Sequence, residues 1–365
     1  MKKPKILMLI TELDIGGAET IVYNQVRELR RRGFDVAVAC LYGKGVMAKK
    51  IVDAGIRVYF LQACCKYDFR VLFRLRKILK EQHFDVLHCH LFHANIIGRF
   101  AAIRIKSIRI ISTIHVMEID KLYRIWFDGI TSFLVDRYIC VSKSVKQFIM
   151  QKANVSAKKI TVVYNGIDLD QMIPTRSSDQ IKQEWGLTNE VVIGSVGRLH
   201  EQKGHSYLLE AFQLILKKGI NIRLVIVGEG PLRQFLEAKT VSLDIAQCVA
   251  FIGFKEDIIN YMQVLDIFVL PSLWEGFGLV VTEAMALAKP VIATDVDGVP
   301  EIVCNSKTGY IVEPASVEML AEKITALVID RQKSSEMGLL GRERVRNYFS
   351  HKQMVSTLIL VYNSL

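Results

Sequence analysis

Long apolar runs are missing from this 365-residue sequence, although apolar residues make up 51% of it. They occur in runs of about five to eight residues, well short of the ~18 that a membrane-spanning helix needs. The basic and apolar start, residues 1–10, is interpreted as a buried strand and not a signal peptide, because the run ends at Glu12 and Asp14. We therefore expect no integral membrane protein and a cytoplasmic chain.

Paired cysteines are missing as well. The seven cysteines are odd in number and scattered, with no Cys-x-x-Cys pair, so neither a disulfide framework nor a structural zinc site is indicated. His88, His90 and His93 lie close in sequence, but no fourth ligand is evident. We expect no metal site there, and His90 fits better as a residue that hydrogen-bonds a ligand.

Basic residues are unevenly distributed along the chain. Residues 1–170 hold 29 Lys and Arg against 15 Asp and Glu, whereas residues 171–365 hold 19 against 22. The segment 70–80 alternates basic and apolar residues at helical spacing. It fits either an interfacial helix on an anionic membrane or a helix with a solvated basic face, and both interpretations stay open. A docking face would consist of Arg70, Arg74, Lys77 and Lys80, with Arg104 and Lys106 nearby. No nucleic-acid partner is expected.

Short β-branched runs alternate with segments of helical period, which is typical of parallel α/β sheets. We expect two doubly wound, Rossmann-like domains that face each other across a cleft: residues 1–170, a polar linker at 171–190, and residues 191–345. A last helix, 346–365, has no strand after it and is expected to pack back on the first domain. The expected strands are 5–11, 35–40, 57–61, 85–89, 109–113, 137–141, 160–163, 191–196, 222–227, 266–270 and 290–293. The expected helices of the first half are 17–32, 70–82, 92–104, 122–135 and 142–152.

Ligands of open parallel sheets bind beyond the carboxyl ends of the strands, and candidate residues follow strands in both halves. Gly16 and Gly17 follow the first strand, and His115 follows the strand that ends at Thr113. Arg198 and Lys203 follow the strand at 191–196, five positions apart and just before a helix. Two cations beside a helix N-terminus would clamp a diphosphate without a metal ion, although a solvated basic loop fits them too.

The segment 271–284 strengthens the interpretation as an anion site. Gly276 and Gly278 would let the backbone approach a ligand, and a helix that begins near 278 would direct free N–H groups at an anion. Glu283 lies one turn into that helix, where its carboxylate could accept hydrogen bonds from a ribose diol. Glu275 could contact sugar hydroxyls. An exposed Trp-Glu-Gly-Phe-Gly loop is difficult to explain as core packing.

These motifs together resemble the retaining glycosyltransferases of family 4, over nearly the whole chain. The resemblance rests on Arg198 with Lys203, on Glu275 and Glu283 eight positions apart, and on the segments 14–19, 164–168 and 298–303. Asp297 departs from the family, which commonly has glycine there. The resemblance implies the GT-B fold, a nucleotide-diphosphate sugar as donor, and no cofactor. A UDP-sugar is the expected donor, with GDP-mannose as the alternative.

The resemblance also implies a role for each matching residue. His115 would reach toward the sugar, Arg198 and Lys203 would grip the diphosphate, and Glu283 would hold the ribose. The remaining donor contacts would come from Glu275, from the backbone of Gly276, Phe277, Gly278 and Leu279, and from Gly16, Gly17, Gly228, Phe254 and Lys255. The acceptor would be a glycan or a lipid-linked sugar of the cell envelope, with His90 as a hydrogen-bonding group on the acceptor side. The acceptor hydroxyl would attack the anomeric carbon of the donor on the face from which the leaving phosphate departs. No residue is singled out as a covalent nucleophile.

Three other functions are less well supported by the sequence than this one. A sugar-nucleotide epimerase on the same fold is disfavoured by the spacing of Glu275 and Glu283. A non-catalytic sugar-nucleotide-binding subunit is disfavoured because His115, Glu275 and Arg198 are all present. A dehydrogenase is poorly supported, because no Gly-x-Gly-x-x-Gly follows the first strand of either half.

Overall fold

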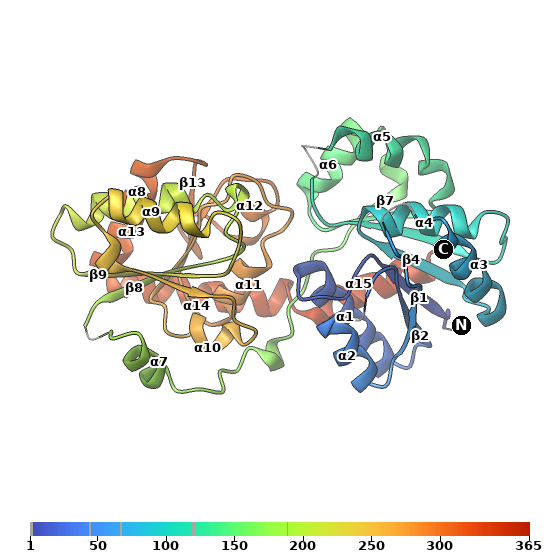
Figure 1. Cartoon of the computed structure of the whole chain (residues 1–365), viewed down its shortest axis with the longest axis horizontal. Coiled ribbons are helices and arrows are strands. Elements are labelled where there is room, and N and C mark those ends of the chain that lie inside the picture. Colours follow the sequence, from blue (N-terminus) through green and yellow to red (C-terminus); the bar gives the residue numbers. More distant parts are fainter. Residues whose placement is uncertain (1–2, 44, 66–67, 118–120, 188) are drawn as a thin grey trace. The chain divides into compact units, whose positions relative to one another are not determined.

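Two parallel sheets with helices on both faces organise the chain (Figure 1). The computed structural model describes residues 3–365 except 44, 66–67, 118–120 and 188. Residues 1–168 and 350–365 form one unit, and residues 169–349 form the other. The α/β class with two Rossmann-like sheets is as predicted. Among the described residues, no helix combines the length and the apolar character that a membrane span requires.

The first unit contains a seven-stranded sheet in the order β3-β2-β1-β4-β5-β6-β7, and all the strand pairs are parallel. All seven strands were predicted. They are β1 Ile6–Ile10, β2 Val36–Cys40, β3 Arg57–Phe60, β4 Val86–His90, β5 Arg109–Ile114, β6 Arg137–Cys140 and β7 Ile160–Val162. The helices are α1 Gly17–Arg31, α2 Val46–Asp53, α3 Arg70–Gln82, α4 Phe92–Ala102, α5 Leu122–Ile130, α6 Lys143–Lys152 and α15 His351–Asn363.

The second unit contains a six-stranded parallel sheet in the order β10-β9-β8-β11-β12-β13. Its strands are β8 Val191–Val196, β9 Ile222–Val227, β10 Val249–Gly253, β11 Ile267–Leu270, β12 Val291–Thr294 and β13 Gly309–Val312. Its helices are α7 Ser178–Glu184, α8 His205–Leu216, α9 Arg233–Ser242, α10 Ile258–Met262, α11 Leu279–Ala286, α12 Val299–Ile302, α13 Val317–Ile329 and α14 Arg331–Tyr348. The buried faces of β8, β9 and β11 join α8 and α13 in one apolar core.

The structure differs from the prediction in four places. Helix α2, Val46–Asp53, was not predicted. Strands β10 and β13 were missed, because each is only four or five residues long and β10 is only partly buried. The predicted linker 171–190 is no free linker: it contains α7, whose Ile181 packs on Tyr261 and Val264 in the second unit. The predicted final helix is broken between Tyr348 and His351, so that α14 belongs to the second unit and α15 to the first.

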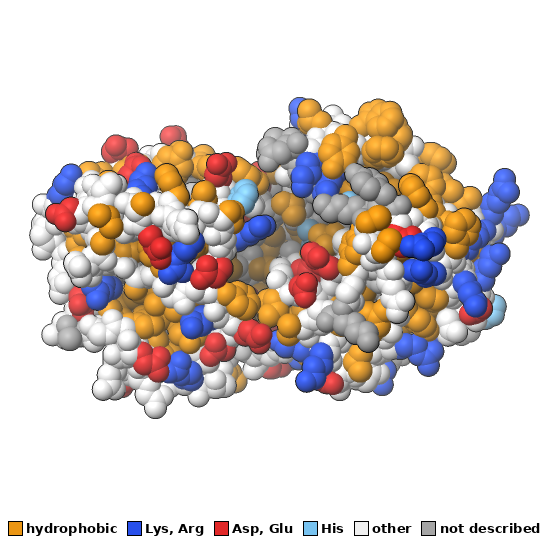
Figure 2. Space-filling view, in the orientation of Figure 1, with side chains coloured by type: hydrophobic (Ala, Val, Ile, Leu, Met, Phe, Trp, Pro, Cys, Tyr) orange, Lys and Arg blue, Asp and Glu red, His pale blue; other side chains and the backbone are white. Residues whose placement is uncertain are grey.

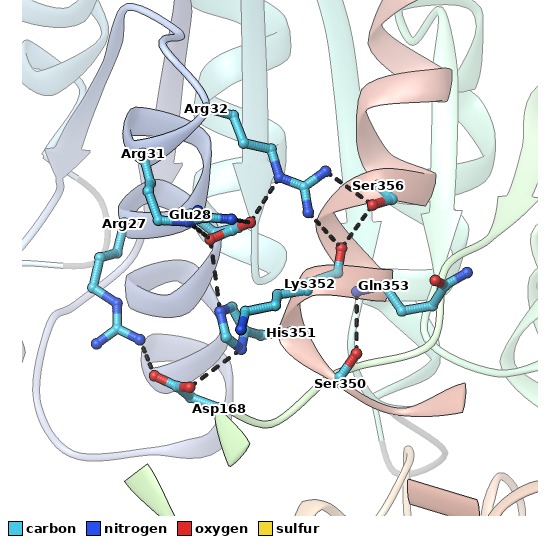
Figure 3. Close-up of polar contacts among 10 residues, drawn as sticks. All are labelled: Arg27, Glu28, Arg31, Arg32, Asp168, Ser350, His351, Lys352, Gln353 and Ser356. Carbon is cyan, nitrogen blue, oxygen red and sulfur yellow. Dashed lines mark hydrogen bonds and ion pairs between the residues drawn. The ribbon is translucent and has the colours of Figure 1, made fainter. Parts of the chain in front are cut away.

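A buried polar network fastens α15 to α1 beside the two points where the chain passes between the units (Figure 3). Glu28 of α1, which is 2% exposed, accepts hydrogen bonds from Arg31 and Arg32. His351 lies 3.7 Å from Glu28 and 3.4 Å from Asp168, and Arg27 pairs with the same aspartate. The passage at Asp168 is therefore tied to α1 by the ion pair with Arg27, and the passage at His351 lies against the buried carboxylates of Glu28 and Asp168.

We predict that Glu28 makes the protein acid-sensitive. Hydrogen bonds from Arg31, and then from Arg32, lower the pKa of Glu28 from 4.5 to about 2. This stabilisation is fully present above about pH 4.5 and is lost as the pH falls toward 2. Glu28→Gln should therefore lower the free energy of unfolding by about 2 kcal/mol at pH 7, and the difference from wild type should narrow below pH 4.5.

Urea unfolding from about pH 3 to pH 7 measures this difference, and Glu81→Gln on the exposed end of α3 is the control. A Glu28→Gln variant as stable as wild type at pH 7 would contradict the role of the network.

Candidate functional site

The clearest cluster of candidate residues lies at the carboxyl ends of β8 and β11. These strands are neighbours in the sheet, and the strand order reverses between them, because β9 lies on the other side of β8. The loops that follow them leave in opposite directions, which opens a crevice for ligands in folds of this class. Arg198 and Lys203 follow β8, and Glu275 follows β11.

The structure brings Lys203 and Glu275 into direct contact. Lys203 Nζ lies 2.5 Å from Glu275 Oε2, and both side chains are about 15% exposed. Ser272 Oγ lies 3.4 Å from the same carboxylate oxygen. Arg198 is exposed and forms no ion pair or hydrogen bond through its side chain within the described part of the chain. One cation is thus held in place by a carboxylate, while the second can turn toward a ligand.

Backbone contacts hold the loops after β8, β9 and β11 together. Leu273 N donates to Gln202 O at 2.7 Å, and Gln202 Nε2 donates to Trp274 O at 3.1 Å. At Gly228 a Cβ atom would lie 2.0 Å from the carbonyl oxygen of Gly197, so only glycine fits. Gly228 therefore lets the loop after β9 approach the loop after β8.

Helix α11 begins with backbone N–H groups that have no side-chain cap. Its N-cap residue, Gly278, has φ +89°, a left-handed conformation that favours glycine. Such a helix end attracts anions, because N–H groups and the helix dipole both favour negative charge there. The backbone from Gly276 to Leu279 thus leads directly into a helix end without a side-chain cap.

The expectation of an exposed loop was wrong for Phe277. Its side chain is 3% exposed and packs against Phe349 with the ring centroids 5.7 Å apart. Gly276 and Gly278 are buried too. Aromatic residues in a glycine-rich loop can anchor it to the core, so the ring of Phe277 is not available to a ligand.

Glu283 lies one turn into α11, and burial raises the pKa of its carboxyl from 4.5 to about 7. Near neutral pH this carboxyl therefore exchanges a proton readily. Ionised, it accepts two hydrogen bonds, as a ribose diol requires.

Asp297, the position where the resemblance expects glycine, adopts φ +48°, the left-handed conformation that glycine favours. Its carboxylate accepts a hydrogen bond from Glu275 N at 2.6 Å. Burial, and then the charge of Glu275, raise the pKa of Asp297. The aspartate therefore keeps the loop conformation and adds a bond that orients Glu275.

The two base-pocket candidates follow β10. Phe254 is 53% exposed, which leaves its ring free to stack on a planar group. Lys255 Nζ lies 5.4 Å from the centroid of the Tyr261 ring, and Tyr261 itself stacks on Trp185. Phe254 is thus the better placed of the two for a base.

In the first unit, Gly16 and Gly17 lie at the start of α1, after β1. A carboxylate oxygen of Glu19 occupies the space beside Gly16, 2.3 Å from where a Cβ would lie. Burial, and also the charges of Glu12 and Asp14, raise the pKa of Glu19. An acidic group therefore already lies at this helix N-terminus, a feature that the prediction of donor contacts there did not include.

Buried imidazoles connect the ends of β4 and β5. His90 Nδ1 lies 3.0 Å from His115 Nε2, so the predicted acceptor-side residue His90 is hydrogen-bonded to His115, the residue expected to reach toward the sugar. His88 uses both ring nitrogens, one toward Thr113 Oγ1 at 2.6 Å and one toward Tyr362 Oη at 2.8 Å. Burial lowers the pKa of His115 to about 4 and of His88 to about 3, so both are neutral at physiological pH.

Tyr362 is a member of this cluster that sequence reasoning missed. It lies on α15, 274 residues after His88, and no local pattern signals the contact. Among the described residues, no group of three His, Cys, Asp or Glu side chains is arranged to hold a metal ion.

The basic residues of α3 are partly engaged within the first unit. Arg70 pairs with Asp68 at 2.8 Å, and Arg74 Nη1 donates to the carbonyl oxygens of Leu61 and Gln62. Lys77 lies 3.8 Å from Glu81, and Lys80 is exposed. Three of the four predicted membrane-docking cations, Arg70, Arg74 and Lys77, thus already have intramolecular partners.

Two family models cover most of the chain. Residues 15–171 match the model described as Glycosyltransferase Family 4, and residues 177–344 match Glycosyl transferases group 1. The chain therefore belongs to the group 1 glycosyltransferases of family 4 type, and it is a glycosyltransferase with the GT-B fold.

Individual relatives and solved structures match over nearly the full length. The chain is 27% identical to the Escherichia coli UDP-Gal:alpha-D-GlcNAc-diphosphoundecaprenol alpha-1,3-galactosyltransferase, with 87% of this chain and 86% of that protein covered. It is 28% identical to the capsular polysaccharide biosynthesis glycosyltransferase CapM of Staphylococcus aureus, with 100% and 98% covered. The Anabaena protein HepE, solved with UDP-glucose, superposes with a TM-score of 0.88 at 22% identity over 99% of this chain and 100% of that one.

We predict that Glu283→Gln stabilises the ligand-free protein at alkaline pH. The pKa of Glu283 is raised from 4.5 to about 7, so ionising the buried carboxyl costs stability as the pH rises through this window. Glutamine does not ionise, so the melting temperature of the variant should exceed that of wild type by a few degrees at pH 8 and match it near pH 4.5.

Thermal unfolding at both pH values measures the effect, with Glu318→Gln on the exposed side of α13 as control. A variant that melts below wild type at pH 8 would show that the Glu283 carboxylate is not destabilising there.

Proposed function

We propose that this chain is a retaining, metal-independent glycosyltransferase that moves a hexose from a UDP-sugar to a lipid-linked or glycan acceptor of the cell envelope. The observation that carries the proposal is the pair of cations after β8. Lys203 is held by Glu275, and Arg198 has no side-chain partner within the described residues. GDP-mannose remains the alternative donor.

The two cations, Arg198 and Lys203, suit the step in which the bond between the donor sugar and the diphosphate breaks. When the bond between the anomeric carbon and the diphosphate oxygen cleaves, negative charge grows on the leaving phosphate. Fixed cations and helix N–H groups neutralise such charge without a metal ion. Lys203, Arg198 and the N-terminus of α11 are groups of this kind, and all three belong to the second unit.

Glu283 and Glu275 complete the donor side. The ionised Glu283 would accept hydrogen bonds from the ribose hydroxyls, an interaction present equally before and during the reaction. Glu275 keeps Lys203 within 2.5 Å and is itself oriented by Asp297, and its other oxygen remains for sugar hydroxyls. Phe254 would stack on the nucleotide base.

His115 is the acceptor-side candidate. Its pKa of about 4 keeps the ring neutral, so it can exchange hydrogen bonds with a sugar hydroxyl without adding positive charge. Its partner His90 fixes the ring through a 3.0 Å contact. In the proposed same-face attack, the acceptor hydroxyl bonds to the anomeric carbon as the phosphate leaves, and the departing phosphate oxygen takes the hydroxyl proton.

The relatives support a lipid-linked or envelope acceptor. The Escherichia coli relative acts, by its name, on a sugar diphosphate carried by undecaprenol, and CapM belongs to capsular polysaccharide synthesis. The basic surplus of the first 170 residues fits an acceptor held near an anionic membrane. Peripheral contact with the cytoplasmic face of the membrane is therefore part of the proposal.

Lys203→Ala should lower turnover by about 100-fold or more, because its charge matters most as the diphosphate leaves. Steady-state transfer with saturating UDP-sugar measures this loss. Lys323→Ala is the matched control, since Lys323 is also an ion-paired lysine of the second unit, 2.7 Å from Glu322, but far from strands β8 and β11 in the chain. Near-normal turnover in Lys203→Ala would remove the lysine from the clamp.

Transfer should continue in excess EDTA, because the fixed cations replace a divalent ion. The initial rates with EDTA, with added magnesium and with added manganese should agree within about twofold. Activity that EDTA abolishes and manganese restores would overturn the metal-independent mechanism.

A further inference from the structure

An apolar ridge covers the outer side of α5 and the short 3₁₀ turn Ser132–Leu134 that follows it. Its side chains are large and exposed, and Leu122, Trp126 and Phe133 are 69%, 60% and 74% exposed. Figure 2 shows hydrophobic side chains gathered at the position of α5, with Lys and Arg side chains beside them. The ridge consists of Leu122, Tyr123, Trp126, Phe127, Ile130 and Phe133.

The ridge is one face of the helix and not a scatter of exposed residues. At about 100° per residue, its five members on α5 fall within an arc of about 140°. Ile125 is the buried residue of α5, and Arg124 and Asp128 lie on the opposite flank. A contiguous apolar face of this kind on a protein surface marks an interaction site.

Buried polar contacts hold the ridge outward. The fully buried Arg99 donates to Asp128 Oδ1 and to Thr131 Oγ1, each at 2.6 Å. Lys159 Nζ donates to the carbonyl oxygens of Ser132 and Val135 at 3.0 and 2.8 Å. The inner side of α5 is therefore fixed by charge, and the apolar side chains cannot turn into the core without breaking these bonds.

The charges around the ridge indicate its partner. Residues 118–159 contain eight Lys and Arg against four Asp and Glu, and two of these acidic residues already pair with arginines, Asp128 with Arg99 and Asp136 with Arg109. Lys121, Lys152 and Lys158 are exposed. Aromatic side chains flanked by lysines suit the boundary between lipid headgroups and acyl chains. A second copy of the chain would bring like charges together.

A cavity on the inner flank of α5 connects the ridge with the acceptor side. Its lining includes Arg124 and Ile125 of α5, Phe148 of α6 and His115 after β5. An acceptor whose lipid anchor stays in a bilayer at the ridge would have its sugar close to His115.

We propose that the α5 ridge is the surface by which this chain sits on an anionic lipid bilayer, so that a lipid-linked acceptor reaches His115 directly from the membrane. The role of the acceptor rests on the proposed function, whereas membrane binding by the ridge does not. The ridge also replaces α3 as the docking surface, because Arg70 and Arg74 of α3 have internal partners.

The test is flotation of the full-length chain with vesicles of phosphatidylcholine, alone or with phosphatidylglycerol. Trp126→Ser with Phe133→Ser should reduce binding to anionic vesicles about tenfold or more. Phe69→Ser with Phe73→Ser is the matched control, since these α3 side chains are 76% and 70% exposed, and it should bind as wild type does. Binding of the wild type should fall with added salt.

Other outcomes overturn the proposal. If the α3 variant alone loses binding, the docking surface is α3. If wild type ignores anionic vesicles, or elutes as a dimer that the ridge substitutions convert to a monomer, the ridge is not a membrane surface. Transfer to a short water-soluble acceptor keeps the two proposals separate, because the ridge variant should retain it. If the wild type itself transfers no sugar to this soluble acceptor, the proposed function is refuted instead.

Discussion

The ion pair between Lys203 and Glu275 joins the loop after β8 to the loop after β11, and the donor site depends on it. The two strands are neighbours at the point where the strand order of the second sheet reverses. Side chains that are 72 residues apart are therefore brought together by the topology. Without a carboxylate partner, a lysine in this half-buried position would carry an uncompensated charge whenever no donor is bound.

Several neighbouring features serve this pair. Asp297 accepts a hydrogen bond from Glu275 N, and Gly228 lets the loop after β9 pack against the one after β8. Phe277 anchors the glycine-rich loop through Phe349, and α11 begins after this loop without a side-chain cap. Glu283 is kept in apolar surroundings at a cost in stability, as expected of a group placed for binding.

The fold could be predicted because each buried parallel strand is a short run of mostly apolar residues in the local sequence, as at 191–196 and 222–227. The candidate donor-site residues could be proposed for a similar reason, since each motif lies directly after a strand. Short strands such as β13, with glycine at its start, lack that signal.

Contacts between distant segments could not be predicted. The bond between His88 and Tyr362 and the network of Glu28 with His351 join residues more than 270 positions apart, and nothing in either segment alone indicates the other. The burial of Phe277 was missed because glycine-rich loops with aromatic residues can be exposed or anchored, and only the position of Phe349 decides it. The outward face of α5 is similar, since the sequence alone does not show which side of the helix faces the core, and the hydrogen bond from Arg99 to Asp128 identifies that side.

We propose above all that a donor diphosphate binds at the start of α11 beside Lys203. Amide hydrogen exchange measured with and without a UDP-sugar, in EDTA, tests it most directly. We expect the donor to slow exchange at the first amides of α11, Leu279 to Val281, and Lys203→Ala to weaken this protection. If a saturating donor leaves these amides unprotected, the diphosphate binds elsewhere and the proposed site at the start of α11 is wrong.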